Sequence, residues 1–365
     1  MLSLLNCRER QARLVHVMRD HRLDVVVLSN PKTIHYFSGA LTDPAQPQAF
    51  GIRASGETLL VTNARPEQAA ADEVLLYTGY TLERPFSRAT MHQELVAMVA
   101  RRYRRSGPVA LEFDYAGHAL GAALDPVGDI TPHLQRMRRR KDADEIAAIR
   151  ECIRITEAAY GAVKARLEPG MTEYQAYNII SEAMVNAAGR SVEVRGDFAA
   201  GTRGINGGGP PTDRRLESGD LYILDLFPLH QGYVCDLCRT FVVGTPSEEQ
   251  QAAWKHVMAG HDVACRVMRP GATGRDVYRA VRDHMESYPK FRGSFSHHAG
   301  HGVGMDGWEF PWLTPGSDQP LVEGEVIACE PGLYGEELRG GIRLEHNYLV
   351  GKDGVTALDS FPMDL

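Results

Sequence analysis

Cysteine is scarce in this chain: six residues among 365, scattered from Cys7 to Cys329. Scattered cysteines in a chain of this length indicate free thiols in a reducing compartment rather than a disulfide framework. Long hydrophobic runs are also missing, since no stretch approaches the roughly 20 apolar residues of a membrane span. The N-terminal MLSLLNCRER lacks the apolar segment of a signal peptide. We therefore expect a cytoplasmic protein that does not enter a membrane.

An excess of positive charge is missing as well. The 40 Lys and Arg residues face 47 Asp and Glu residues, which gives a net charge of −7. Such a surface attracts neither nucleic acid nor anionic lipid, so neither is expected as a partner. The one basic run, RMRRRK at 136–141, is interpreted as the entrance to a helix.

The first part of the chain has the pattern of an α/β domain. Apolar residues recur at helical spacing over 8–21, and LDVVVLS at 23–29 is a continuous buried-strand run. The pattern predicts one further helix at 89–105 and further strands at 48–53, 57–62, 74–77 and 108–113. No cluster of ligand-type residues occurs here. We predict an α/β N-terminal domain over residues 1–135.

The remaining residues, 136–365, have a pattern typical of an α+β domain, with glycine-punctuated strands and loops from residue 294 onward. Four helices and a loop are expected before them: a long helix after the basic run, a helix from a capping box of Thr172 and Gln175 to Ala188, a Gly- and Pro-rich loop over 198–220, and amphipathic helices at 247–268 and 274–288. With about 150 residues per domain, the length of the chain suits this division in two.

Two aspartates interrupt apolar strands in this second part. Residues 219–244, GDLYILDLFPLHQGYVCDLCRTFVVG, have the pattern of a hairpin with Asp225 in one strand and Asp236 in the other. Folding about the His230–Gln231 bond pairs them, so their carboxylates would face each other about 5 Å apart. Burying both charges bare would cost on the order of several kcal/mol. Two arginines or a shared proton could neutralise them, but the rest of the sequence favours a metal ion.

Three further residues are able to bind a divalent metal: His301 in HHAGHGVG, Glu330 in VIACEPGLY and Glu345 in GGIRLEHNYLV. Both glutamates interrupt apolar runs, where an unpartnered glutamate is uncommon. One shared site is the simplest explanation, since two divalent cations would cancel four carboxylates. An oxygen-rich set with one imidazole suits Mn²⁺, Fe²⁺, Co²⁺ or Zn²⁺. Two such ions can hold a bridging hydroxide and polarise a carbonyl, as in two-metal hydrolysis.

The motifs that contain these residues resemble those of the prolidase, aminopeptidase P, methionine aminopeptidase and creatinase family. The segment LDVVVLSNPKTIHYFSG also resembles the N-terminal domain of the prolidase and creatinase branch, so the resemblance covers nearly the whole chain. It implies a creatinase-like N-terminal α/β domain, a pita-bread catalytic domain and a homodimer. The motifs are GD at 219–220, GHG at 300–302, EPG at 330–332 and GGIRLE at 340–345.

The resemblance also implies a role for each ligand at a site of two divalent ions, with Mn²⁺ preferred and Co²⁺, Fe²⁺ or Zn²⁺ as alternatives. Asp225 would chelate one ion, and Asp236 and Glu345 would bridge both. His301 and Glu330 would complete the second and are the catalytic candidates, because Glu330 would accept the proton of the nucleophilic water.

Two positions depart from the family's peptidases, which usually carry a histidine at each. Gly208 aligns with the first, and Trp308 stands at the histidine of a His-Glu-x-Pro motif. Those histidines are thought to contact the substrate, and loss of such a donor typically costs about 10²–10³ in rate. Either another histidine replaces them or the substrate differs. The candidates for substrate contact are His297, His298 and His346, Trp308 as a pocket wall, and Arg203 as a partner for a substrate carboxylate, although a loop arginine is more often solvated.

Three functions are consistent with this sequence. The first is a dinuclear-metal hydrolase resembling Xaa-Pro dipeptidase or aminopeptidase P, which cleaves the amide bond before proline in a small peptide. The second keeps the metals but acts as a hydrolase or lyase on a small amide, guanidino or onium compound, whose cation Trp308 could contact through its ring. The third is a non-catalytic binding protein, which would have no reason to keep four buried carboxylates.

Overall fold

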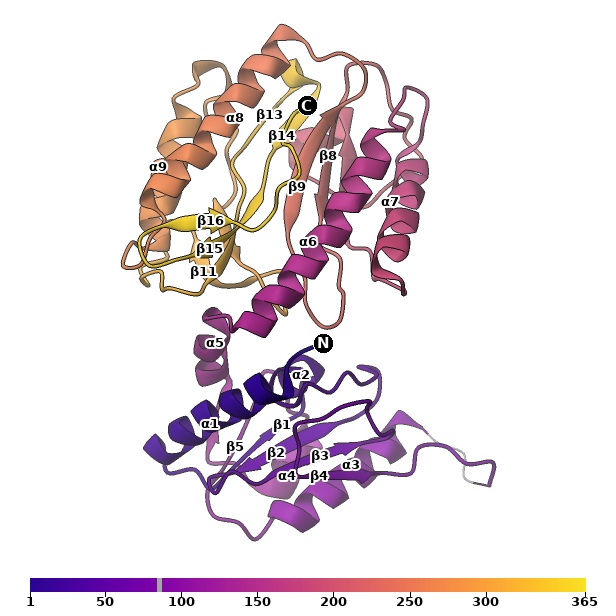
Figure 1. The fold of residues 1–365 in the computed structure, drawn as a ribbon, viewed down its shortest axis with the longest axis vertical. Helices are drawn as coiled ribbons and strands as arrows, with labels where there is room; N and C mark the ends of the chain where they lie inside the picture. The colour runs from indigo at the N-terminus through magenta and orange to yellow at the C-terminus, as the bar shows by residue number, and fades with distance from the viewer. Residues whose placement is uncertain (84–86) are drawn as a thin grey trace. The chain divides into compact units, whose positions relative to one another are not determined.

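The computed structural model describes residues 1–83 and 87–365. Its internal contacts divide the chain into two compact units, Met1–Met137 and Arg138–Leu365 (Figure 1). Each unit is described by itself below.

A six-stranded mixed sheet with the order β4-β3-β2-β1-β5-β6 builds the first unit. Its strands are β1 (Val25–Leu28), β2 (Ala49–Arg53), β3 (Thr58–Thr62), β4 (Glu73–Leu76), β5 (Val109–Leu111) and β6 (Gly128–Asp129). The helices are α1 (Leu4–Asp20), α2 (Pro31–Ser38), α3 (Arg88–Tyr103) and α4 (His118–Leu124). The apolar run at 23–29 forms the fully buried β1 inside the sheet. The predicted α/β class of this domain is confirmed.

The basic run at 136–141 does not open a helix, contrary to our expectation. It ends α5 (Thr131–Arg139), and the long helix α6 (Ala143–Lys164) begins only after Asp142. The Asp142 backbone N–H donates to Glu145 Oε2 at 2.9 Å, so acidic residues rather than basic ones satisfy the start of the helix.

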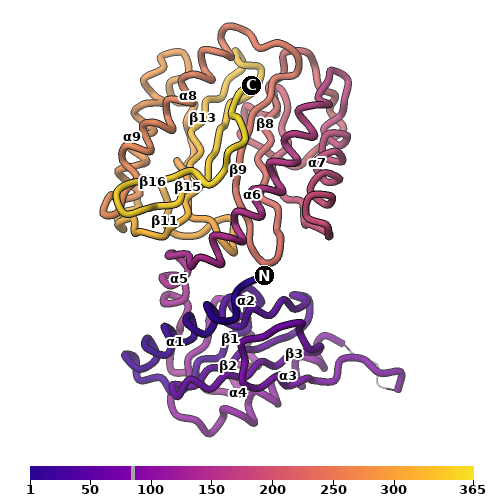
Figure 2. The backbone as a smooth tube through the Cα atoms, viewed as in Figure 1, coloured from indigo at the N-terminus to yellow at the C-terminus, as the bar shows by residue number. Residues whose placement is uncertain are grey.

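The second unit places its strands between two pairs of helices (Figure 1). The helices are α6 and α7 (Glu173–Ala188) in one pair, and α8 (Glu248–Val267) and α9 (Gly274–Glu286) in the other. The strands form three groups: β7 (Gly196–Ala200), β8 (Leu221–Leu226) and β9 (Leu237–Val242); β13 (Gly332–Gly335) and β14 (Gly340–Arg343); and β10 (Gly300–Gly302), β11 (Glu309–Leu313), β12 (Val326–Cys329), β15 (His346–Val350) and β16 (Val355–Ala357). β14 pairs with β13 and contacts both β8 and β9, and these strands lie in the middle of the unit in the backbone trace (Figure 2).

The predicted capping box of Thr172 and Gln175 is confirmed at the start of α7. The Gly- and Pro-rich segment predicted as a loop over 198–220 is only partly one. Its first residues belong to β7, which pairs antiparallel with β8. Small residues hid this strand, because they have low strand propensity.

The β8–β9 hairpin forms, but the predicted register is wrong. His230 pairs with Tyr233, and both residues between them, Gln231 and Gly232, have positive φ (48° and 82°). Such a turn is of the type I′ kind favoured by hairpins, and it centres the hairpin one residue later than expected. Asp225 therefore pairs with Cys238. The two aspartates still share a face, because a shift of two residues preserves the alternation of a strand.

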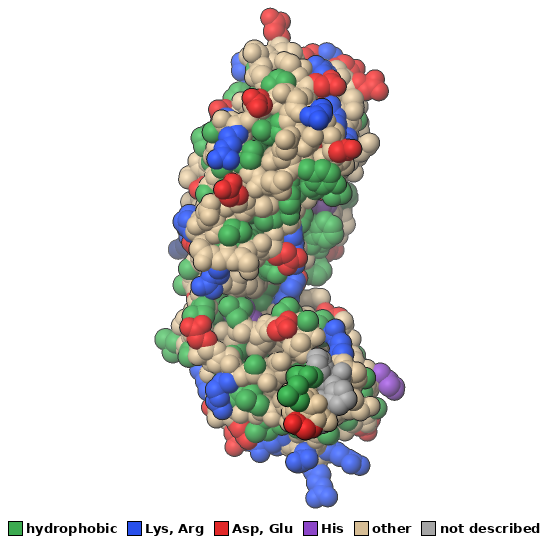
Figure 3. Space-filling model, turned by 90° about the vertical axis from the view of Figure 1, so that its right-hand side faces the viewer, with side chains coloured by type: hydrophobic (Ala, Val, Ile, Leu, Met, Phe, Trp, Pro, Cys, Tyr) green, Lys and Arg blue, Asp and Glu red, His purple; other side chains and the backbone are tan. Residues whose placement is uncertain are grey.

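On the surface shown in Figure 3, acidic and basic side chains are interspersed. Among residues 1–83 and 87–365, no helix combines the length and apolar character needed to span a membrane.

Candidate active site

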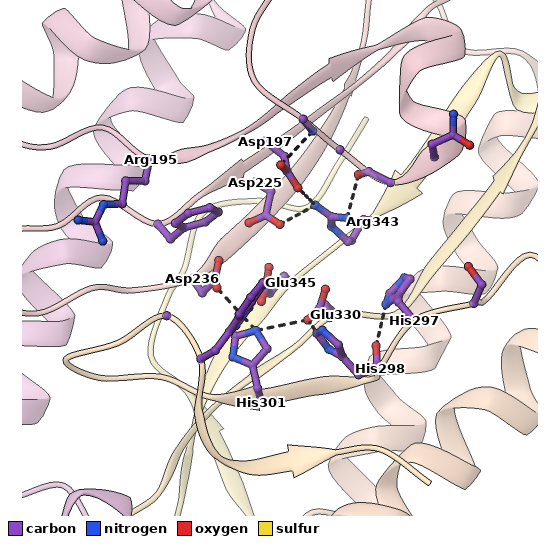
Figure 4. Close-up of a pocket in the computed structure, with 18 of the residues that line it drawn as sticks. Arg195, Asp197, Asp225, Asp236, His297, His298, His301, Glu330, Arg343 and Glu345 are labelled. Atoms are coloured by element: carbon purple, nitrogen blue, oxygen red, sulfur yellow. Dashed lines mark hydrogen bonds and ion pairs between the residues drawn. The ribbon is translucent and has the colours of Figure 1, made fainter. Parts of the chain in front are cut away.

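A cavity of about 1040 Å³ lies in the second unit, and residues of the 195–236 and 296–345 segments line it. All five predicted ligands line this cavity, two of them from the β8–β9 hairpin and three from the segment after residue 300 (Figure 4). His297, His298, Trp308 and Gly208 line it as well. The fold thus gathers residues that are up to 120 positions apart in the sequence, from Asp225 to Glu345.

Asp236 precedes β9 and is held through its backbone. Its N–H donates to Asn347 Oδ1 (3.1 Å), and its carbonyl accepts from Asn347 Nδ2 (2.5 Å). One buried side chain thus satisfies both backbone groups and fixes where the Asp236 carboxylate points. Among the described residues, its Oδ1 has no hydrogen-bond partner.

Glu345 lies between β14 and β15 and is completely buried. Its N–H donates to the carbonyl of Cys238 (3.0 Å), and its carbonyl accepts from Arg239 Nη1 (2.6 Å). Both oxygens of its carboxylate lack a hydrogen-bond partner. Burial, with the nearby carboxylates of Asp236 and Asp225, raises the pKa of Glu345 well above its ordinary value.

Asp225 is compensated on one oxygen only. Its Oδ2 accepts from Arg343 Nη2 at 2.6 Å, whereas its Oδ1 has no hydrogen-bond partner. Burial raises the pKa of Asp225 to about 6, although Arg343 opposes this shift. Burial and the charge of Asp225 raise the pKa of Asp236 well above its ordinary value.

His301 lies on β10, and one of its ring nitrogens forms a hydrogen bond with the backbone. Nδ1 lies 3.0 Å from the carbonyl of Gly302, which can only accept, so Nδ1 carries the proton and Nε2 has a free lone pair. Nε2 lies 3.7 Å from Asp236 Oδ2 and 3.5 Å from Glu330 Oε1. Burial lowers the pKa of His301, so the ring is neutral at neutral pH. A neutral imidazole oriented by a carbonyl is the usual state of a metal-binding histidine.

Glu330 lies among histidines. His298 Nδ1 is 3.1 Å from its Oε1. The preceding residue, His297, has both ring nitrogens within hydrogen-bond distance of a partner: Nε2 lies 2.9 Å from Tyr334 OH, and Nδ1 lies 2.7 Å from the His298 carbonyl. Burial disfavours ionisation of Glu330, but the close approach of His298 and the positive charge that the neighbouring histidines can carry outweigh it and hold its pKa at about 2. Glu330 is thus an ionised carboxylate, suited to bind a cation.

A divalent cation fits these residues. Ligand atoms of Asp236, His301 and Glu345 lie within 4.8 Å of one another, as do those of His297, His298 and Glu330. The 3.5–3.7 Å separations at His301 are too long for hydrogen bonds. They approach the spacing of roughly 3–3.5 Å between neighbouring ligands of one ion with bonds of about 2.1 Å. The partnerless oxygens of Asp225, Asp236 and Glu345 point to the same conclusion, because buried charges normally have partners.

Two residues that sequence reasoning missed complete the opposite wall of the cavity. Arg343 Nη2 donates to both Asp225 and Asp197 Oδ2 (2.9 Å), and Arg343 Nη1 donates to the carbonyl of Gly207 (2.8 Å). Asp197 Oδ1 accepts from the N–H of Gly209 at 2.9 Å. Arg343 stands inside the GGIRLE motif, next but one to Glu345, and that position was the available signal. Asp197 had none, because a single aspartate in a loop-like segment is ordinary.

The structure explains why residue 208 is glycine. A Cβ atom at Gly208 would lie 2.0 Å from Asp197 Oδ2, so the carboxylate of Asp197 fills the space that a side chain would need. A histidine at this position requires Asp197 to move away.

Trp308 is 70% exposed on a loop at the cavity, with its ring 6.3 Å from Trp312 and 6.5 Å from His301. The next residue, Glu309, anchors this loop. It pairs with Arg138 and with Lys141 Nζ (2.9 Å), and its Oε1 accepts the backbone N–H groups of residues 305 and 306.

Two candidates for substrate contact do not reach the cavity among the described residues. Arg203 pairs with the buried Glu173 and donates to the carbonyl groups of Phe198 (2.9 Å) and Pro210 (2.8 Å). His346 lies 2.5 Å from Asp359 Oδ2. Both side chains support the backbone around the site instead.

An α/β domain followed by a pita-bread domain whose cavity gathers carboxylates and imidazoles defines a metallohydrolase. The model of metallopeptidase family M24 matches residues 147–352, more than half of the chain, and the chain belongs to this family. Residues 10–140 match the creatinase/prolidase N-terminal domain. The predicted family and the predicted two-domain fold are therefore confirmed.

Two relatives and one solved structure illustrate the similarity. An Xaa-Pro dipeptidase of Pyrococcus furiosus is 26% identical over 359 residues, covering 98% of this chain and 99% of the relative. A putative Xaa-Pro aminopeptidase of Mycoplasma pneumoniae is 34% identical over 59% of this chain and 61% of its own. The solved structure of an Xaa-Pro dipeptidase from Bacillus anthracis covers 99% of both chains with a TM-score of 0.85 at 24% identity, which shows a shared fold.

Proposed function

We propose that this metallopeptidase cleaves the amide bond before proline in small peptides, as an Xaa-Pro dipeptidase or aminopeptidase, with two divalent cations bound by Asp225, Asp236, His301, Glu330 and Glu345. The observation that carries the proposal is the set of buried carboxylate oxygens without a partner on Asp225, Asp236 and Glu345. The names of the relatives support the substrate class.

The ions would polarise the scissile carbonyl and lower the pKa of the attacking water. The chain's own residues would do the rest. Glu330, an ionised carboxylate at the cavity, would accept the proton of the water. The His301 ring, held by the Gly302 carbonyl, would keep its Nε2 lone pair directed at the cation site. Trp308 would form the apolar wall beside this site.

A second candidate function is favoured by the exposed ring of Trp308. A tryptophan face at a cavity lined by carboxylates suits a cationic group, so a small onium or guanidino compound is the alternative substrate.

The test is turnover of a panel of Xaa-Pro dipeptides and Xaa-Pro-containing tripeptides by protein reconstituted with Mn²⁺, with metal content measured on the same sample. Turnover of about 1–10³ per second supports the peptidase. Two bound equivalents of metal without cleavage favour the small cationic substrate. Absence of metal binding contradicts both.

A further inference from the structure

Asp197 has no role in the proposed metal set, yet it lines the same cavity. It lies on β7, opposite Asp225 in the antiparallel pair β7–β8, and 33% of its side chain is exposed. Figure 4 shows it in one row with Asp225 and Arg343, across the cavity from Asp236, Glu345 and Glu330.

The arginines that line the cavity are poorly placed to bind a substrate carboxylate. Arg343 already donates to two carboxylates and one carbonyl, and only 8% of its side chain is exposed. Arg195 pairs with Glu193 at 2.8 Å, and its guanidinium points away from the carboxylates in Figure 4. The described wall of the cavity is therefore better equipped to bind a cation than an anion.

Asp197 is the acid on this wall that can receive such a cation. It shares a single nitrogen of Arg343 with Asp225, so one guanidinium serves two carboxylates. The glycines at 207–209 leave the carboxylate uncovered, since even a Cβ at Gly208 would displace it. A carboxylate that is partly exposed to the cavity and held in place by Arg343 and the Gly209 N–H is a suitable partner for an ammonium group.

We propose that Asp197 is a specificity-determining residue that binds the free α-ammonium group of the substrate. This inference rests on the proposed function, because it assumes a peptide substrate with a free N-terminus. Asp197 is coupled through Arg343 to Asp225, so the ammonium group would lie beside the cation site and the scissile bond next to it would be the one presented for hydrolysis.

The test compares L-alanine with propionate, two ligands that differ only in the ammonium group, by ligand-observed NMR titration of Mn²⁺-free, Zn²⁺-loaded protein. The wild type should bind alanine at least about 10-fold more tightly, as expected for a charge-assisted hydrogen bond. Asp197→Asn should remove most of this preference, and Asp197→Glu should restore part of it. Asp213→Asn, an exposed aspartate elsewhere in the same segment, is the matched control and should keep the preference.

Equal weakening of both ligands by Asp197→Asn would overturn the inference, since a structural role in holding Arg343 would act on both alike. An unchanged preference in that variant would overturn it too. Xaa-Pro turnover by the wild type is measured separately. If turnover is absent but the alanine preference depends on Asp197, the proposed cleavage before proline fails, and what stands is the binding of an α-ammonium group by Asp197. If turnover is present but the preference does not depend on Asp197, the inference fails and the proposed function stands.

Discussion

Buried acids of the second unit fall into two groups. Members of the first each pair with a cationic side chain of the protein: Glu309 with Arg138 and Lys141, Asp359 with Arg239, Glu173 with Arg203, and Asp220 with Arg214. Members of the second, Asp225, Asp236 and Glu345, are about as deeply buried, but among the described residues each has a carboxylate oxygen without a hydrogen-bond partner. Only Asp225 pairs with an arginine, Arg343. Both groups come from the same domain and the same depth.

The pKa values show what this difference means. Burial alone raises the pKa of a carboxyl in either group. In Glu309, Arg138 and Lys141 overcome burial and hold the pKa well below its usual range. In Glu345, neighbouring carboxylates add to burial, and the pKa rises well above it. In the first group, which we call the complete group, side chains of the protein compensate the buried negative charge. In the second, the incomplete group, full compensation requires a bound cation.

Removing one acid from the incomplete group should have the largest effect. We expect Glu345→Gln to lose bound metal and at least about 10³-fold of the peptidase activity together, since one stabilising group at a reacting centre alone contributes about 10²–10³. Metal content by mass spectrometry and turnover of Ala-Pro check this on one sample. Glu323→Gln, an exposed glutamate, is the control. Full metal occupancy in Glu345→Gln would contradict the shared site.

Removing one acid from the complete group should instead lower the free energy of unfolding. Glu309→Gln leaves Arg138 with Asp306 as its remaining anion and removes the acid that pairs with the buried Lys141. Removing one partner of a buried pair typically costs about 3–5 kcal/mol. Denaturant titration measures the loss. Glu249→Gln removes the acid of an exposed pair with Lys290 and should leave the stability nearly unchanged. Equal effects of the two substitutions would contradict the distinction between buried and exposed pairs.

The two groups should also respond oppositely to pH in metal-free protein. Burial raises the pKa of Asp225 to about 6, and burial with the neighbouring carboxylates raises the pKa of Glu345 well above its ordinary value, so the folded state holds these protons more tightly than the unfolded state. Their contribution to stability is full below the unfolded pKa of about 4 and is lost as pH rises through about 6. Glu309, whose pKa is lowered, contributes above about pH 4 and loses that contribution on acidification.

Chemical denaturation with EDTA at pH 5.5 and 7.5 tests this pH dependence. We expect metal-free wild type to be less stable at pH 7.5, Glu345→Gln to reduce the difference, and Mn²⁺ to reverse it. A metal-free protein whose stability is the same at both pH values would show that the site acids are compensated by some group of the chain.

The residues of the incomplete group could be predicted from the sequence, whereas the register of the hairpin that carries two of them could not. Asp225, Asp236 and Glu345 were found because a charged residue inside an apolar strand run contradicts the pattern around it. The hairpin register was missed because it depends on the turn. Gln231 adopts a left-handed conformation there, which is unusual for glutamine and could not be predicted from its residue type. Helix α5 was missed because it is short and mostly polar, and strand β7 was missed because its pairing with β8 rather than a local periodicity defines it.

The wall formed by Arg343 and Asp197 could not be predicted from local pattern at all. The two residues are 146 positions apart, and only the fold brings them to 2.9 Å. Asp197 also changes the meaning of Gly208. The sequence presented Gly208 as the loss of a histidine, whereas the structure shows a position whose space another side chain already occupies.

The smallest expected effect concerns how the incomplete group is held in place. Asn347 binds both backbone groups of Asp236 and lies outside the cavity lining, so it acts on the site only through Asp236. We expect Asn347→Ala to weaken metal binding by about 10–100-fold without abolishing it, the usual effect of losing a residue that orients a ligand. Competition with a chelator measures the affinity, and Asn178→Ala, on the exposed face of α7, is the control. An unchanged affinity would mean that the hydrogen bond from Glu345 to Cys238 fixes the hairpin by itself, and that the carboxylates are ordered by the cation rather than prepared for it.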